Sequence, residues 1–367
     1  MAPRSRASIV EVAKRANVAI SSVSRVLSGH PDVSDAMRAR VMLAVDELGY
    51  RTDLLAQGLR RRETLTIGFV VGDISNPLLA EITMGAETRL RDAGYSMLLT
   101  NSENDPEIDA EQIGLLQQRR VDGLLLSLAS EDNPSMIAAL DGLDIPCVLI
   151  DREVASSVER RPSAVLSDHA SGMQDAVGHL LDLGHRRIAL VLGRPLRYSR
   201  ERRRGLEQAY ARRGLSQSFE NVEGSSTAEH GARATERLMG RRAAPPTAIV
   251  AGSNQLLVGI LEALHDRKLR PGVDISLVSC DAVALTELLD PPIAVVRRDN
   301  RQLGRTAAEL LLRRLQDDTT EPEIVSLPTE FISRPSCVAA PSERRRQPDP
   351  SSRRNRELDS DSPARQS

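Results

Sequence analysis

At 367 residues the chain is long enough for two or three domains, and its 40% hydrophobic and 27% charged residues are ordinary for a soluble protein. No run approaches the roughly 20 apolar residues that span a bilayer, and the basic N-terminus lacks the apolar core of an export signal. These features exclude membrane and secreted proteins and predict a cytoplasmic one. Cys147, Cys280 and Cys337 lack metal-ligand spacing and are expected to be packing or surface residues.

The formal charge is distributed unevenly along the chain. Residues 1–62 contain 11 Lys and Arg against 6 Asp and Glu, a balance of +5, whereas the whole chain has a net charge of −2. The rest of the chain is therefore acidic. A basic head on an acidic body is typical of a nucleic-acid-binding module joined to a domain that does not touch phosphates.

The head begins with a predicted helix. Ser8 and Glu11 match the S-x-x-E pattern of a capping box, in which the two side chains satisfy free N–H groups at a helix start. Asn17 is expected to end this helix in a left-handed conformation, which asparagine tolerates better than most residues. The apolar stripe of this helix is Ile9, Val12, Ala13 and Ala16.

Two more helices follow within residues 8–50. The second is predicted over residues 20–27, and the third begins after Ser34 as N-cap and ends at Gly49. Two short helices separated by a tight turn and backed by a third helix predict a helix-turn-helix unit. The apolar stripe of the third helix is Met37, Val41, Ala44, Val45 and Leu48.

The second helix has one apolar face, formed by Val23, Val26 and Leu27, and one polar face. In a helix-turn-helix, the first residues of this helix meet base edges in the major groove. Arg25 can offer two donors to guanine, which discriminates against other bases by about 1–3 kcal/mol. The alternative interpretation is an ordinary solvated helix face. The polar face consists of Ser21, Ser22, Ser24 and Arg25.

From Thr64 onward, short apolar runs alternate with amphipathic helical stretches such as residues 78–93, 170–183 and 255–268. Apolar strands without alternation are typical of parallel sheets covered on both faces. The runs are too numerous for one compact sheet and favour two similar α/β subdomains. The runs are TIGFVVG, YSMLLTN, VDGLLLSL, IPCVLID, SAVLSD, RRIALVLG, TAIVAGS, ISLVSCD and IAVVRRD.

The C-terminal residues 341–367 are polar, charged and rich in Pro and Ser, so a disordered tail is expected there. The chain has no GxxxxGK[ST] loop, no strand-linked GxGxxG and no HExxH, and its six His residues show no metal-ligand spacing. We therefore expect neither an enzyme nor a protein that holds a metal or cofactor.

Six collinear segments make the chain resemble the lactose-repressor/galactose-repressor (LacI/GalR) family of transcription regulators. They run in family order across about residues 8–336, which is nearly all of the chain that is expected to be ordered. The segments are IVEVAKRANVAISSVSRVLSGHPDVS, ELGYRTDLLAQGLRRRETLTIGFVVGDISNPLLAEI, RRVDGLLLS, LGHRRIALVLG, ISLVSCD and LLDPPIAVVR.

The resemblance implies a small all-α helix-turn-helix head at residues 1–50 and a hinge helix at 51–62. It also implies a periplasmic-binding-protein-like core at 63–340, made of two doubly wound parallel-sheet subdomains that the chain crosses three times. The expected boundaries are about 63–161 plus 294–321 for the N-subdomain, and about 162–293 plus 322–340 for the C-subdomain.

The resemblance further implies a sequence-specific DNA-binding repressor of the nucleoid. It would bind a near-palindromic double-stranded operator as a homodimer, and a small-molecule effector, by family default a sugar, would bind in the cleft between the subdomains. Two alternatives remain open, a regulator that binds DNA without any ligand and a solute-binding protein. The second requires an export signal and has no use for residues 1–62.

On the DNA side, the resemblance matches Ile20, Ser21 and Arg25 to base-reading positions, with Ile20 against a thymine methyl group and Ser22 and Ser24 toward phosphates. Asn17 stands at the usual glycine of the turn. Ala19 replaces a usual serine, which removes a helix N-cap worth about 0.5–2 kcal/mol and a phosphate contact.

In the hinge, Leu59 matches the leucine that relatives insert between base pairs of the minor groove, and Arg60 follows it. Ala56 would face the hinge helix of the second subunit. Because Gly58 lowers helicity by up to about 1 kcal/mol, this segment is expected to be unfolded off DNA.

In the cleft, Arg202 matches an arginine that grips a ligand hydroxyl or carboxylate, and Asn254 stands where an acid is usual. Structural pairing of Arg202 with Asp281 is an equal alternative. The chain has no Trp, and its three Phe residues lie away from matched positions, so few aromatic rings are available to stack against a sugar. Tyr198 is expected in a loop that could reach the cleft. The matched effector positions are Leu78, Leu79, Asp168, Arg202, Asn254, Asp281 and Asn300.

Overall fold

The computed structural model describes residues 7–50, 63–154, 158, 161–216, 218–241, 245–317 and 321–341. The chain divides into two compact units, residues 1–65 and 66–367, which are described separately below. The predicted hinge, with Ala56, Leu59 and Arg60, and the predicted tail beyond residue 341 lie outside the described residues.

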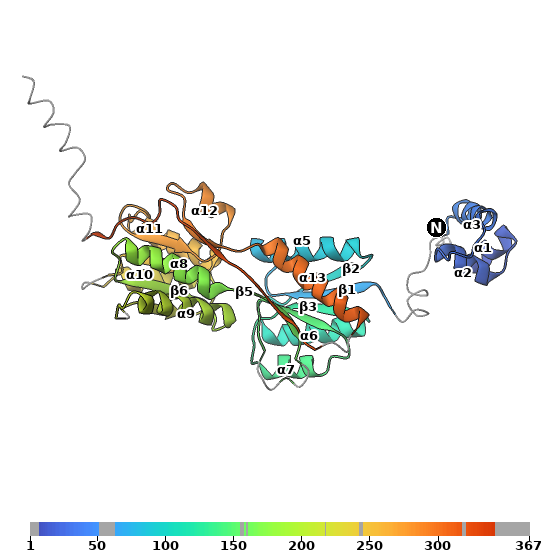
Figure 1. Ribbon diagram of the computed structural model, residues 1–367, viewed down its shortest axis with the longest axis horizontal. Coiled ribbons are helices and arrows are strands. Elements are labelled where there is room, and N and C mark those ends of the chain that lie inside the picture. Colours follow the sequence, from blue (N-terminus) through green and yellow to red (C-terminus); the bar gives the residue numbers. More distant parts are fainter. Residues whose placement is uncertain are drawn as a thin grey trace, which may run out of the picture. The chain divides into compact units, whose positions relative to one another are not determined.

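The first unit contains three helices, α1 (Ile9–Ala16), α2 (Ile20–Leu27) and α3 (Asp35–Leu48), seen together in Figure 1. The predicted capping box is confirmed, because the Ser8 hydroxyl accepts from the Glu11 N–H and Glu11 accepts from the Ser8 N–H at 2.6 Å. The predicted left-handed Asn17 is also confirmed, with φ of 52°. Ser34 caps α3 by accepting from the Met37 N–H.

The core of this unit is small and comes from one face of each helix. Val12, Val23 and Val41 are completely buried in it. The predicted stripe of α3 is wrong at its end, because Leu48 is 37% exposed. It lies in the last turn of the helix.

The second unit contains two six-stranded sheets and the helices that cover them. The strands of the first sheet are β1 (Thr66–Val71), β2 (Ser96–Asn101), β3 (Gly123–Ser127), β4 (Cys147–Ile150), β5 (Ser163–Ser167) and β11 (Ile324–Leu327). Its helices are α5 (Pro77–Asp92), α6 (Pro106–Gln118), α7 (Pro134–Asp141) and α13 (Asn300–Gln316).

The strands of the second sheet are β6 (Ile188–Leu192), β7 (Glu220–Glu223), β8 (Ala248–Ala251), β9 (Ser276–Ser279), β10 (Ala294–Arg297) and β12 (Glu330–Ile332). Its helices are α8 (His169–Asp182), α9 (Arg197–Arg212), α10 (Ala228–Met239), α11 (Asn254–Asp266) and α12 (Ala284–Leu288).

Each sheet has helices on both faces, as Figure 1 shows for α5 and α13 on one side of the first sheet and α6 and α7 on the other. Strand β1 explains this arrangement. Its Ile67 and Phe69 pack under α5 and α13, whereas Val70 points into the core under α6 and α7. A strand buried on both faces needs no polar alternation, which is why the apolar runs predicted the parallel sheets correctly.

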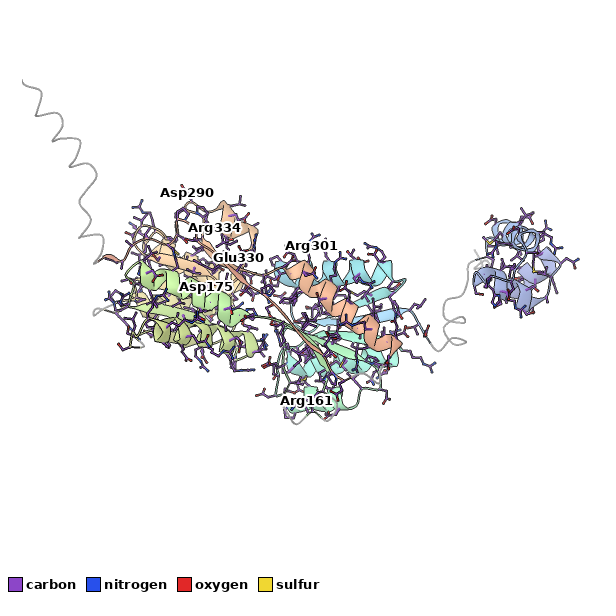
Figure 2. The ribbon with its side chains drawn as sticks, viewed as in Figure 1. Arg161, Asp175, Asp290, Arg301, Glu330 and Arg334 are labelled. Atoms are coloured by element: carbon purple, nitrogen blue, oxygen red, sulfur yellow. The ribbon has the colours of Figure 1, made fainter. Side chains whose placement is uncertain are left out.

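The strand order is β11-β5-β4-β3-β1-β2 in the first sheet and β12-β10-β9-β8-β6-β7 in the second. All neighbours are parallel except β10 and β12, which are antiparallel. The Arg297–Glu330 ion pair at 2.7 Å also joins these two strands, and Figure 2 shows Glu330 on this subdomain.

The chain passes between the sheets three times, after β5, after β10 and after β11, as predicted. The predicted subdomain boundaries differ from the structure by one strand at each passage. Residues 163–167 and 324–327 were expected in the C-subdomain but pair within the first sheet, and residues 294–297 were expected in the N-subdomain but pair with β9. Each strand stays with the sheet that supplies its hydrogen bonds, and its apolar composition does not identify that sheet.

Helices α5 and α13 approach each other closely because glycines line their contact. A Cβ atom at Gly304 would lie 1.9 Å from the carbonyl oxygen of Ile82, and one at Gly85 would lie 2.0 Å from that of Arg301. Figure 2 shows Arg301 at this helix pair. Helix α13 begins after the chain has passed back from β10 to the first subdomain, and this contact holds it against α5.

Candidate functional site

Helix α2 presents its predicted polar face to solvent. Ser21 and Arg25 are exposed, Ser22 and Ser24 are half-buried, and Ile20 is 43% exposed although it is apolar. Among the described residues, none accepts a hydrogen bond from the Arg25 guanidinium or forms an ion pair with it. This side chain is therefore free to contact another molecule, and its assignment to a base remains a prediction.

The start of α2 lacks the side-chain cap that most helices have. Ala19 has the extended backbone of an N-cap, with φ of −66° and ψ of 151°, but offers no side-chain acceptor. Its carbonyl oxygen accepts from the Ser22 N–H at 2.9 Å, which is a backbone contact of the first turn. The expected loss of a cap at Ala19 is thus confirmed.

A cavity of about 90 Å³ lies where the carboxyl ends of strands from both sheets meet. This is the place where open parallel sheets bind ligands. Its lining includes Asn76 after β1, Ile150 at the end of β4, Ser253 after β8 and Arg298 after β10. The volume is below the roughly 150 Å³ of a cavity that holds benzene, so a sugar-sized ligand requires the cleft to open further.

Five of the seven predicted effector residues line this cavity: Leu78, Leu79, Arg202, Asn254 and Asp281.

The other two predicted effector residues have structural partners away from the cavity. Asp168 caps α8 by accepting from the Ser171 N–H at 3.1 Å and from its hydroxyl group. Asn300 donates to Glu81 at 2.8 Å. The structure therefore does not bring Asp168 and Asn300 together with the other five.

Arg202 and Asp281 form a buried ion pair with 3.5 Å between guanidinium and carboxylate. Arg202 also donates to the Gly252 carbonyl, and Asp281 accepts from the Asn254 N–H at 3.1 Å. Each group therefore already has protein partners in this conformation. The structural ion pair between Arg202 and Asp281, which the sequence left open as an alternative, is therefore present. A ligand would have to share or displace these bonds.

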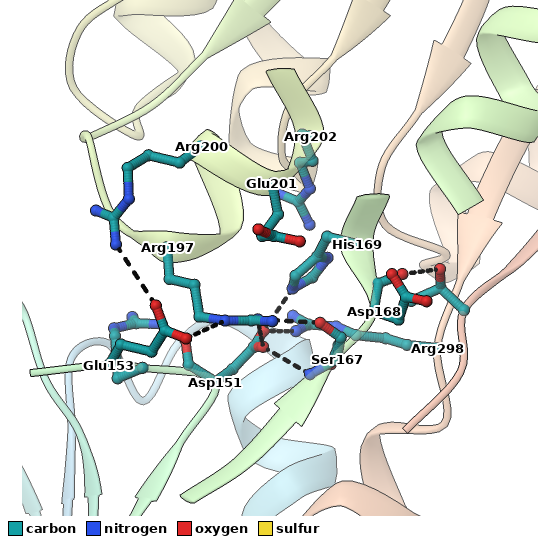
Figure 3. Close-up of polar contacts among 12 residues, drawn as sticks. Asp151, Glu153, Ser167, Asp168, His169, Arg197, Arg200, Glu201, Arg202 and Arg298 are labelled. Atoms are coloured by element: carbon teal, nitrogen blue, oxygen red, sulfur yellow. Dashed lines mark hydrogen bonds and ion pairs between the residues drawn. The ribbon is translucent and has the colours of Figure 1, made fainter. Parts of the chain in front are cut away.

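A cluster of polar side chains in the cleft surrounds Asp151, which follows β4 of the first sheet (Figure 3). Three groups of the second subdomain reach this carboxylate. His169 Nε2 donates to it at 2.8 Å, Arg197 lies 3.5 Å away, and Arg298 forms a short hydrogen bond with it. The N–H of Ser167 also donates to it, at 3.0 Å.

Burial alone would raise the pKa of Asp151, but His169, Arg298 and the Ser167 N–H hold it well below its ordinary value. Burial lowers the pKa of His169 to about 4, although the carboxylate opposes this change. At neutral pH the carboxylate is therefore charged and the imidazole is neutral. The arginines balance the charge, and His169 contributes a hydrogen bond.

Other direct bonds join the two subdomains on both sides of the cavity. Glu131, after β3, accepts from the Arg197 N–H at 3.0 Å and pairs with Arg200 at 2.9 Å. At the other side, Gln255 donates to Asp73 at 2.8 Å. The structure is thus a closed state held by side chains of the protein itself.

Tyr198 lines the cavity, as predicted from its position, but it lies in the first turn of α9 rather than in a loop. The guanidinium carbons of Arg152 and Arg202 lie 5.3 and 5.1 Å from its ring centroid. Phe69 and Phe219 pack in hydrophobic cores instead. The aromatic contribution to the lining is therefore one ring, and guanidinium groups already contact it.

Several residues of the cleft were absent from the predicted set, namely Asn76, Asp151, Arg152, His169, Arg298 and Gln255. The sequence contained a usable signal for three of them. Asp151 and Arg152 directly follow the run IPCVLI, and Arg298 directly follows β10. Polar residues just beyond buried parallel strands gather at the ligand-binding edge of a sheet, so this rule would have identified them.

Within the described residues, no group of three or more His, Cys, Asp or Glu side chains is placed to hold a metal ion. No helix in the same part of the chain is long and apolar enough to cross a membrane.

Comparisons with known proteins agree with both units. Residues 8–53 match the model of bacterial regulatory proteins of the lacI family, and residues 177–337 match a periplasmic binding protein-like domain. The HTH-type transcriptional repressor PurR of Aliivibrio fischeri (strain MJ11) is 30% identical over 336 residues, which cover 90% of this chain and 98% of that protein.

The ribose operon repressor of Escherichia coli (strain K12) is also 30% identical, over 90% of this chain and its own full length. Among solved structures, the lac repressor dimer bound to operator and the anti-inducer ONPF has a TM-score of 0.80 and 26% identity, and covers 91% of this chain. The chain therefore belongs to the lacI family of bacterial regulatory proteins and is a DNA-binding transcriptional repressor.

Proposed function

We propose that two copies of this repressor read a near-palindromic operator through their α2 helices, and that a small molecule in the cleft controls how tightly they do so. In this proposal Arg25, Ile20 and Ser21 contact base edges. Ser22 and Ser24 contact phosphates, and Asn17 shapes the turn before α2. Ala56, Leu59 and Arg60 act in the hinge, at the centre of the operator.

The observation that carries the DNA-reading role is the Arg25 side chain, which is exposed and has no partner in the part of the chain that the structure describes. A guanidinium without a protein partner retains all its donors for a guanine edge. Ile20 supports this role, because an isoleucine exposed on a helix is most useful where it meets an apolar group such as a thymine methyl. The lac repressor dimer on its operator supports the proposed stoichiometry.

The effector role of the cleft is supported by the five predicted residues around the cavity, Leu78, Leu79, Arg202, Asn254 and Asp281. A ligand changes a protein's conformation only through unequal affinity for its states. Because the cleft is closed by direct bonds between the subdomains, any molecule that enters must alter those bonds. We propose that this coupling changes how the two heads are held on DNA.

The test is selection of genomic DNA fragments by the full-length protein, followed by affinity measurements on the selected site. We expect Arg25→Ala to relax the preference at one base pair of each half-site. We expect Arg60→Ala to weaken binding across sequences and to reduce the salt slope by about one. The matched control is Arg15→Ala. It also removes one positive charge from the head, but the Arg15 guanidinium is already paired with Glu47 at 2.5 Å.

If Arg25→Ala and Arg15→Ala left the same base preferences, the assignment of Arg25 would be wrong. If the unaltered protein bound selected and random DNA equally at modest ionic strength, the DNA-reading role itself would fail.

The second candidate is a repressor that works without any ligand, and the direct bonds that close the cleft favour it. A thermal-shift screen followed by footprinting separates the two, because a stabilising ligand that leaves operator affinity unaltered would support the ligand-independent form. In both cases we propose a cytoplasmic protein without catalytic activity or cofactor.

A further inference from the structure

The cleft contains a row of charged side chains in which positive and negative groups alternate. Asp151, after β4 of the first subdomain, lies 3.5 Å from Arg197 and forms a short hydrogen bond with Arg298. Asp281, after β9 of the second subdomain, lies 3.5 Å from Arg202 and 3.8 Å from Arg298. Arg298 is thus the member of the row that contacts both carboxylates, and Figure 3 shows its side chain reaching Asp151.

Arg298 is held in the cleft by these two carboxylates. It has no other hydrogen-bond or ion-pair partner in the part of the chain that the structure describes, and its Nε atom is buried without a partner there. The side chain is 15% exposed, although arginine is rarely buried unless it is paired. The pairing with Asp151 and Asp281 therefore accounts for its position.

Closure of the cleft brings the two carboxylates together. Asp151 belongs to the first subdomain, whereas Asp281 and Arg298 belong to the second. Buried carboxylates that approach each other repel, and each of them is costly to bury without a cation. Arg197 and Arg202 each contact one of the two, but a cation between them offsets the repulsion directly. The Arg298 guanidinium therefore favours the approach of the subdomains.

Arg298 also fills space that a ligand would need. It lines the cavity together with the five predicted effector residues, and one of these, Asp281, is its own partner. The remaining volume of about 90 Å³ leaves no room for a sugar-sized ligand. A guanidinium group of this chain thus lies where an external molecule would bind, and it joins the two subdomains as such a molecule would.

We propose that Arg298 is a built-in occupant of the cleft. The site between Asp151 and Asp281 takes a guanidinium cation, which the protein supplies from its own chain, and the cleft closes without any external molecule. This inference deepens the ligand-independent form of the proposed function, and it rests on that function only where operator binding is measured. A molecule that enters the cleft has to displace Arg298 from Asp151.

The test removes the arginine and returns its head group as a free molecule. In full-length Arg298→Ala, the two carboxylates lose their shared cation, and the cleft should open. Methylguanidinium at about 10 mM, a concentration at which molecules of this size bind, should occupy the vacated position and close the cleft again. Sodium chloride at the same concentration controls for ionic strength. The unaltered protein should not respond, because its site is filled.

The measurement is hydrogen exchange of the Arg197 amide, followed by mass spectrometry. As the first residue of α9, Arg197 has no partner for this N–H within the helix, and the N–H donates instead to Glu131 of the first subdomain at 3.0 Å. Opening of the cleft breaks this bond. We expect exchange to be about tenfold or more faster in Arg298→Ala, and to slow again with methylguanidinium. The Ser171 amide, bonded to Asp168 at the start of α8, serves as the internal reference.

Two further variants and a matched control sharpen the test. Arg298→Lys keeps the charge but not the fork of donors, so its exchange should lie between those of the unaltered protein and Arg298→Gln. The control is Arg297→Ala at the neighbouring residue, whose side chain is 55% exposed and pairs with Glu330 on β12. It should leave the Arg197 amide unaltered, with or without methylguanidinium. Melting temperatures show whether each variant is folded. If Arg298→Ala fails to fold, the order of the Lys and Gln variants decides the question.

Unaltered exchange in Arg298→Ala would overturn the proposal, as would faster exchange that methylguanidinium reverses no better than sodium chloride. An equal response to methylguanidinium in Arg297→Ala would overturn it too. Operator binding is measured in parallel. If methylguanidinium restores exchange in Arg298→Ala while operator affinity never changes, this inference stands and the proposed coupling of the cleft to DNA fails. If exchange in Arg298→Ala is unaltered but the protein selects its operator, only this inference is lost.

Discussion

His169 predicts a specific dependence of stability on pH. Its imidazole is buried and donates to Asp151 across the cleft, and its pKa is about 4 in the folded protein. The ordinary pKa of histidine is about 6.5. Between these two values the unfolded chain binds a proton that the folded chain does not, so the free energy of unfolding falls as pH falls from about 6.5 to 4.

The magnitude follows from the same two values. Each pH unit in this window removes up to about 1.4 kcal/mol, which gives about 3 kcal/mol between pH 6.5 and pH 4. In His169→Gln, a side-chain amide replaces the imidazole, so a donor to Asp151 is kept but the titration is lost. The variant should therefore lose less stability than the unaltered protein over this window, by about 3 kcal/mol.

The assay is calorimetric unfolding of both proteins at half-unit steps of pH from 7 to 4. Groups that titrate in both proteins cancel in the difference, which isolates His169. His265→Gln is the matched control, because it makes the same substitution at a histidine that is exposed on α11. Parallel pH profiles for the unaltered protein and His169→Gln would refute the argument, since they would mean that His169 does not titrate differently on folding.

Two further predictions concern the helices. Gly304→Ala should lower the free energy of unfolding by about 1–3 kcal/mol, because the new Cβ would lie 1.9 Å from the Ile82 carbonyl oxygen. The control is Gly114→Ala, which should not destabilise the protein because a Cβ there meets no atom within 4 Å. Urea unfolding measures both variants, and equal losses of stability would contradict the close approach of α5 and α13. Ala19→Ser should stabilise the start of α2 by about 1 kcal/mol, because the backbone is already that of an N-cap. Amide exchange at Ser22 should then slow about fivefold, and unaltered exchange would show that the serine does not cap.

The head was predictable from sequence because its signals are local. The capping box of Ser8 and Glu11 and the left-handed Asn17 depend on residues within one helical turn. The error at Leu48 has a different origin. Helical periodicity assigned this residue to the apolar stripe, but burial depends on which residues pack against it in the folded head.

The core was predictable in architecture but not in its strand assignments. The strands β7, β11 and β12 were not predicted. The sequence of β7 is short and polar, β12 has only three residues, and β11 carries Ile324 at 66% exposure. Edge strands are covered less than central ones, so their sequences lack the apolar run that identifies buried strands. The boundary errors arose in the same way, since hydrogen-bonded partners decide which sheet a strand joins.

The cleft was only partly predictable because its chemistry depends on pairs of residues that lie far apart in sequence. Matching single positions identified Arg202 and Asp281 but could not show that they pair with each other. The same limit hid the cluster around Asp151, where one carboxylate of the first subdomain receives groups from three separate segments of the second.

These pairs also bear on how an effector can act. Bonds such as Glu131 with Arg200 and Asp151 with Arg298 stabilise the closed state before any ligand binds. A ligand that merely replaced them with bonds of equal strength would leave the balance between open and closed states unaltered, however tightly it bound. Regulation therefore requires contacts that exist in one state alone.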